Sequence, residues 1–252
     1  MNPRLLRYSR YQLPDFLTQR LALPLILLAF AAGLPTYLMT KNTPPGWMQS
    51  PQGINLAHQM FMQSITLYLP LGAFVGAVGV ISSDRQRGYF RFLFSKPVNV
   101  LAYYAQTYLV HAAVYVAVFG VIVWTFSQYT THFSVHRSME AAALTFVLVG
   151  GVGLMLGALT RADAAGLIAL YVLSLMLHQL MAAPNGLKNG GLPGWHVLIA
   201  KVLPPVHKLD EIRNHLYAAQ PIDMAHLWHV IGYGGVAAAV GFLLLRRLPL
   251  AR

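Results

Sequence analysis

Long apolar runs alternate with short polar segments along most of the chain. A helix rises about 1.5 Å per residue, so about 20 apolar residues cross a hydrocarbon core about 30 Å thick. The runs contain no Asp, Glu, Lys or Arg, as expected for helices in lipid, where an ionised group costs several kcal/mol. They predict six membrane-spanning helices, over residues 21–39, 56–81, 98–126, 141–159, 164–181 and 226–245.

Two further segments have helical patterns of their own. Residues 4–20 mix leucine and aromatic side chains with arginines, which predicts an amphipathic helix on the membrane surface, against the alternative of a partly ordered basic tail. The outer loop, residues 182–225, predicts a helical hairpin interrupted by Pro204 and Pro205, with its second helix over 210–219. We therefore expect an all-α membrane protein in which all 252 residues form one domain.

The composition agrees with a membrane location. Hydrophobic residues make up 56% of the chain and charged residues 10%, and the mean hydropathy is +0.53. Soluble domains carry about 25% charged residues. The chain has no cysteine, which excludes disulfides and thiolate metal sites.

The basic residues predict the orientation. With the N-terminus inside, 12 of the 18 Lys and Arg residues fall in cytoplasmic segments, and four of the other six lie in the long outer loop, where the positive-inside rule is weak. Both termini are therefore expected in the cytoplasm, with the chain crossing the cell (inner) membrane several times. The net charge of +11 belongs to short loops beside membrane helices, which favours membrane lipids over nucleic acid as its partner.

A polar interruption after the second run, "SSDRQRGYFRFLFSKP" (residues 82–97), is the main candidate for function. Its glycine permits a sharp turn, and its proline stands where a new helix can start. Residue chemistry alone leaves two readings open: an aromatic belt at the lipid interface, or a short knob that binds another protein. The candidate residues are Asp84, Arg85, Arg87, Gly88, Phe90, Arg91, Phe92, Phe94 and Pro97.

The order of these residues resembles the permease subunits of the type-2 ABC exporter family. There, a segment after the second helix reads acidic-Arg-acidic-x-Gly-Thr and is followed by an apolar helix and a short turn with proline. Gln86 and Tyr89 depart from that pattern. The resemblance covers the layout of essentially the whole chain, and it implies a transmembrane subunit that forms the translocation pathway of an exporter.

The resemblance also implies partners. Segment 82–97 would be the coupling element that seats in a cytoplasmic ABC ATPase subunit, its arginines pairing with acids and its phenylalanines filling a groove. ATP and Mg would be bound by that ATPase. A second permease chain, in a homodimer or a heterodimer, would complete the pore.

The chain shows no sign of enzymatic activity of its own. A Walker A loop needs Gly-Lys followed by Ser or Thr, and none of the five lysines has such a neighbour. We therefore expect no catalytic residue and no cofactor in this chain. Glycines four apart, Gly72 with Gly76 and Gly153 with Gly157, allow close helix packing, either within the chain, which we favour, or between two copies.

Ten histidines raise two alternative functions, an ion-coupled secondary carrier and a bis-histidine haem membrane protein. A carrier needs ionisable groups inside the membrane, and only His111 and His178 qualify. HExxH is absent and acidic residues are few near the histidines, so no metal site is expected. The substrate is not identified by the sequence, although charge-free helices suit lipids or amphipathic molecules.

Overall fold

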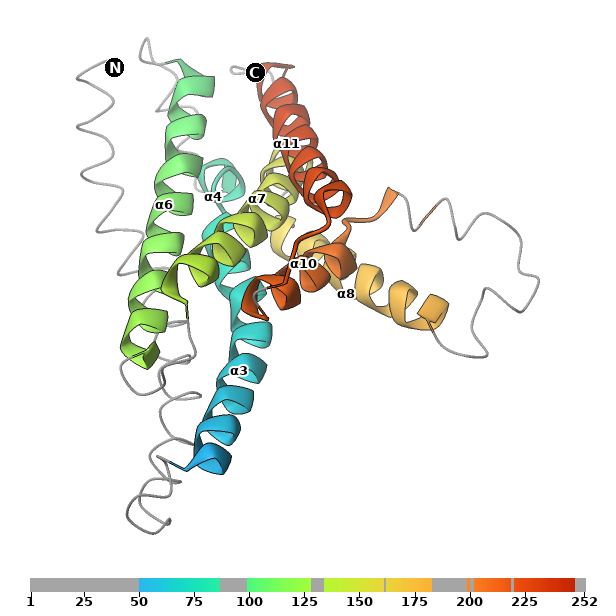
Figure 1. Ribbon diagram of the computed structural model, residues 1–252. Coiled ribbons are helices and arrows are strands. Elements are labelled where there is room, and N and C mark those ends of the chain that lie inside the picture. The colour runs from blue at the N-terminus through green and yellow to red at the C-terminus, as the bar shows by residue number, and fades with distance from the viewer. Residues whose placement is uncertain are drawn as a thin grey trace.

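The computed structural model describes residues 50–86, 99–127, 134–160, 162–182, 199, 202–218 and 220–247, and all regular secondary structure among them is helical (Figure 1). The predicted surface helix (4–20) and the first predicted span (21–39) lie outside the described residues. The helices are α3 (Pro51–Ala77), α4 (Ser82–Gln86), α6 (Val100–Ser127), α7 (Val135–Leu159), α8 (Asp163–Ala182), α10 (Val206–Tyr217) and α11 (Met224–Arg247).

Three of these helices are long and apolar enough to cross a membrane: Val100–Thr125 in α6, Val135–Leu159 in α7 and Met224–Arg246 in α11. Two shorter apolar helical stretches accompany them, Leu69–Asp84 and Asp163–Gln179. Among the described residues, this pattern confirms the all-helical part of the predicted fold class and fits a membrane protein. The count of six spans stays a prediction.

Helix α7 forms the centre of the fold. Two thirds (67%) of its apolar stretch is buried, against 22% for α11, and α7 packs against α3, α6, α8, α10 and α11. Figure 1 shows it crossing diagonally between α6 and α11. Gly151 of α7 and Gly234 of α11 lie so close that a Cβ on Gly151 would collide with the Gly234 carbonyl. Small residues thus let the two helices approach closely.

Several helix boundaries differ from the predicted ones because polar residues cap the ends. Helix α3 starts at Pro51, where the side chain of Ser50 accepts a hydrogen bond from the Gly53 amide. It ends at Ala77, and the turn that follows contains Gly79 with a positive φ of 76°. Helix α7 starts six residues earlier than predicted, because Ser134 caps it.

One end of the bundle brings together several segments that are predicted to be cytoplasmic. A buried cluster of apolar side chains joins the turn after α3, the start of α6, the last part of α7 and the end of α11. Its members are Val80, Ile81, Tyr104, Leu154, Ala158 and Leu245. These chain segments therefore lie at one end of the bundle.

The glycine pairs pack within the chain. A Cβ on Gly72 would meet the ring of Tyr115 in α6 at 2.9 Å, and a Cβ on Gly153 would meet the Ala77 side chain at the same distance. In the outer loop, α10 begins directly after Pro205, four residues earlier than predicted. Most of the first half of the predicted hairpin lies outside the described residues.

Candidate functional site

The predicted coupling segment, residues 82–97, is described only at its start. Ser82 to Gln86 form the short helix α4, which contains Asp84 and the backbone of Arg85. Seven further predicted site residues lie outside the described residues: Arg87, Gly88, Phe90, Arg91, Phe92, Phe94 and Pro97. The structure therefore shows the base of this segment, residues 82–86, where it joins the apolar helices.

A buried carboxylate anchors this base. Asp163, the first residue of α8, is 3% exposed, and its Oδ2 accepts hydrogen bonds from the Gly79 amide and the Ser82 hydroxyl, both at 2.8 Å. Its Oδ1 accepts a third from the Ala164 amide at 2.9 Å. These three hydrogen bonds hold the Asp163 side chain in place at the N-terminus of α8. Asp163 thereby joins the turn before α4 directly to α8.

A second contact joins α4 to α6. The hydroxyl of Tyr104 donates a hydrogen bond to Asp84 Oδ2 at 3.3 Å, and the Tyr104 ring is fully buried among the apolar residues at this end of the bundle. The ring also packs edge-on against Tyr103, with 5.1 Å between the ring centres. Asp84 is thus the predicted site residue that the structure places in contact with a membrane helix.

Sequence reasoning missed Asp163 and Tyr104 as parts of this site. The hydrogen-bond partners of Asp163 stand 81 and 84 residues away in the sequence. A local signal was present, since an aspartate at the start of an apolar run is typical of a helix N-terminus. Nothing local indicated that its second oxygen would bind the α3–α4 turn.

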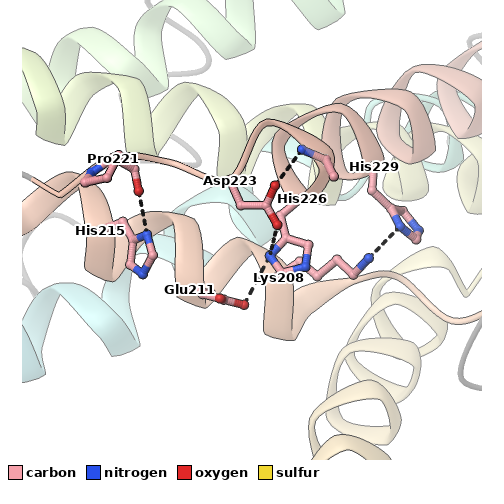
Figure 2. Close-up of polar contacts among 8 residues, drawn as sticks. Lys208, Glu211, His215, Pro221, Asp223, His226 and His229 are labelled. Atoms are coloured by element: carbon pink, nitrogen blue, oxygen red, sulfur yellow. Dashed lines mark hydrogen bonds and ion pairs between the residues drawn. The ribbon is translucent and has the colours of Figure 1, made fainter.

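A second polar group lies where α10 packs against α7, α8 and α11. Figure 2 shows several of its side chains. Lys208 Nζ donates a hydrogen bond to His229 Nδ1 at 2.9 Å. His226 Nδ1 lies 3.2 Å from Glu211 Oε2 and 3.6 Å from Asp223 Oδ2. The expectation that histidines have few acidic neighbours was therefore wrong, because folding brings α10 against the start of α11.

Two other contacts complete this outer polar group. The rings of His178 in α8 and His207 in α10 stack with 4.3 Å between their centres and an angle of 11°. Arg213, which is 4% exposed, pairs with Asp210 at 3.1 Å. Burial lowers the pKa of His207 from 6.5 to about 4, and neighbouring His178 and Lys208 act in the same direction. Burial also raises the pKa of Asp210 from 3.8, although Arg213 and His178 oppose that rise.

The histidines inside the apolar helices have protein partners. His111 is buried in α6, and its Nδ1 lies 2.8 Å from the Gly76 carbonyl of α3. The stacked rings of His178 and His207 face each other flat, so their nitrogens point sideways and not toward a shared iron. Within the described parts of the chain, no three His, Asp or Glu side chains are arranged to hold a metal ion.

Comparison with protein-family models and with curated proteins found no match to this chain. The resemblance to type-2 ABC permeases therefore stands on the residues of segment 82–97 and on the layout of the apolar runs.

Proposed function

We propose that this chain is the transmembrane subunit of an ATP-driven exporter and that segment 82–97 couples it to a separate cytoplasmic ATPase. The observation that carries the proposal is the anchoring of the base of this segment. Asp163 joins the turn before α4 to α8, and Tyr104 joins α4 to α6. A displacement of the segment would therefore act on two apolar helices through direct contacts, as a coupling element requires.

The chemistry of the segment fits a protein partner. Arg85, Arg87 and Arg91 offer charges for acidic residues, and three phenylalanines between 90 and 94 offer an apolar surface in the same short stretch. ATP and Mg would be held by the partner ATPase. A second permease chain would form the other half of the pathway, in the cell membrane, with both termini in the cytoplasm.

His111 bears on the secondary-carrier alternative. Its Nδ1 is engaged by the Gly76 carbonyl, a contact that supports a role in packing α6 against α3. The carrier reading predicts that replacing His111 and His178 by glutamine abolishes transport in the absence of any ATP dependence. Retained transport in that double variant, with ATP required, is the result expected from the exporter proposal.

The deciding experiment is purification of the tagged chain from its own host in mild detergent. A stoichiometric soluble ATPase should accompany it, and the double variant Arg87→Ala with Phe92→Ala should lose that ATPase while remaining folded in the membrane. Arg246→Ala is the matched control, because it removes a positive charge from the end of α11, outside segment 82–97, and should retain the ATPase. Recovery of the chain alone, or unchanged ATP-driven transport by the double variant, would remove the assignment.

A further inference from the structure

The outer polar group contains contacts that respond to acid in opposite ways. His207 stacks on His178, and Lys208 donates to an unprotonated nitrogen of His229. Protons on both rings of the first pair would place two positive charges within one stack. A proton on Nδ1 of His229 would remove the acceptor and set a second cation beside the Lys208 ammonium. Acid therefore weakens the attachment of the first turn of α10 to both α8 and α11.

Other contacts in the group keep α10 attached in acid. A proton on His226 strengthens its pairing with Glu211, one turn further along α10, and with Asp223. The Ser174 hydroxyl donates to the Pro204 carbonyl at 2.6 Å, a contact that does not depend on pH. Acid thus loosens the start of α10 and tightens its middle, so that the Glu211–His226 contact can serve as a pivot (Figure 2).

The remaining charged groups around His207 are few among the residues that the structure describes. On α10 itself they are Lys208, Asp210 and Arg213, and on α11 they are His226 and His229. From α7, Arg137 reaches the other end of α10, where it donates to the Leu216 carbonyl at 3.4 Å. Asp210 works against the histidines, because its raised pKa means that acid relieves a buried charge.

The first turn of α10 covers a small apolar cavity. Leu148, Val149 and Val152 of α7 line it together with Leu167 and Tyr171 of α8, and Pro204 and Val206 close it. Val206 is fully buried there. Loosening this turn would open the space between α7 and α8 that this cavity occupies.

We propose that the first turn of α10 is an acid-sensitive latch, held closed over this cavity by the stacking of His207 on His178 and by the contact between Lys208 and His229, and released when His207 and His229 are protonated. The expected pH range follows from His207. Its ring binds a proton more weakly when docked than when free, so docking is fully favoured above pH 6.5 and weakens as the pH falls from 6.5 toward about 4. Between pH 7.5 and 5.5 the open population should rise about threefold to tenfold, the lower figure allowing for solvent screening of a partly exposed ring.

The absence of cysteine from the chain makes a thiol-labelling test direct. Val206→Cys is close in size to the native side chain and places a thiol under the latch, while Asn214→Cys places one on the exposed face of the same helix. The ratio of the two labelling rates with a water-soluble maleimide cancels the pH dependence of the thiol itself. We expect this ratio to rise about threefold to tenfold from pH 7.5 to pH 5.5.

The histidines are tested by adding His178→Gln and His207→Gln to both reporter chains, which keeps these positions polar and permanently neutral. The rise should then shrink to the part that His229 contributes, whereas His136→Gln, an exposed histidine of α7 paired with Glu140, should leave it unchanged. A flat ratio in the parent, or an undiminished rise in the double histidine variant, would overturn the latch.

Hydrogen exchange on the unmodified chain covers the case in which a variant misfolds. The Leu209 amide, which donates to the Pro205 carbonyl at the start of α10, should lose protection in acid relative to amides of α7, and equal relative protection at both pH values would also overturn the proposal. Neither readout needs ATP or an ATPase. A negative result in these two tests therefore contradicts the latch proposal without bearing on the proposed exporter function. Failure to purify an ATPase with the chain likewise has no bearing on the latch proposal.

Discussion

The carboxylate of Asp163 accepts a hydrogen bond from the Ser82 hydroxyl at 2.8 Å, although 81 residues separate the two. The same oxygen accepts the Gly79 amide, and Asp163 is almost fully buried. A buried donor that loses its acceptor carries the full cost of its desolvation. This one side chain therefore holds α8 against the α3–α4 turn from which the predicted coupling segment starts.

Asp163→Ala should destabilise the protein by about 2–3 kcal/mol, because it leaves two buried donors without an acceptor. The measurement is the unfolding midpoint of the purified protein in detergent. Thr160→Ala is the control, since this exposed hydroxyl bonds only to the Leu156 carbonyl of its own helix and its loss should shift the midpoint little. An Asp163→Ala midpoint equal to that of the parent would show that the contact does not anchor α8.

The crossing of α7 and α11 gives a second prediction with a control in the same helix pair. Gly151→Ala should destabilise the protein by at least about 1–3 kcal/mol, because the new methyl group would overlap the Gly234 backbone and force the helices apart. Gly232→Ala on α11 has no neighbouring atom within 4 Å and should be neutral or slightly stabilising. The two unfolding midpoints test this together, and similar values for both variants would contradict the close approach.

The apolar runs predicted most of the helices that the structure describes, because the requirement for about 20 uncharged residues acts locally. Boundaries were less accurate where a single polar residue decides them. Asn99 accepts hydrogen bonds from the Leu101 and Ala102 amides and so starts α6 at Val100. Ser134 accepts a hydrogen bond from the Arg137 amide and so starts α7 at Val135. Both are ordinary N-cap residues whose signal is present in the sequence.

The candidate site was less predictable for a different reason. The partners of Asp163 come from the turn after α3 and from α4, and Glu211, an acidic neighbour of His226, comes from α10. Such pairs depend on which helices pack together, and the local patterns of a single sequence do not reveal that packing. Residues that act through distant partners were therefore missed, whereas residues in a continuous polar segment could be singled out.

Tyr104→Phe tests the contact between α4 and α6 within the proposed exporter. The variant keeps the buried ring and removes only the hydroxyl that donates to Asp84, so stability should fall by no more than about 1 kcal/mol. ATP-driven transport should fall by a larger factor, about twofold to tenfold, if this contact passes displacement to α6. Transport by reconstituted vesicles, normalised to folded protein, is the measurement.

The control for Tyr104→Phe is Thr125→Ala, which removes an exposed hydroxyl bonded to the Val121 carbonyl at the other end of α6. Its transport rate should match the parent. Equal rates for Tyr104→Phe and the parent would show that α6 does not receive motion through Asp84, and the contact with Asp163 would then be the remaining connection.

The buried pair in α10 predicts a pH-dependent loss of stability. Arg213→Met should cost about 2–4 kcal/mol at pH 7.5, because it leaves the Asp210 carboxylate, which is partly buried, without its counter-charge. Arg213 acts to lower the Asp210 pKa, so its removal raises that pKa further above 3.8. A carboxyl whose folded pKa is raised stabilises the fold most below its unfolded pKa and loses that contribution as the pH rises through the folded value.

The difference in unfolding free energy between Arg213→Met and the parent should therefore shrink as the pH is lowered from 7.5 toward the raised Asp210 pKa. Denaturant unfolding at several pH values measures it. Adding Asp210→Asn removes the carboxylate and should recover most of the loss at pH 7.5, leaving a difference that no longer depends on pH. If the single and double variants are equally unstable at every pH, the cost of losing Arg213 comes from packing alone and the ion pair does not contribute.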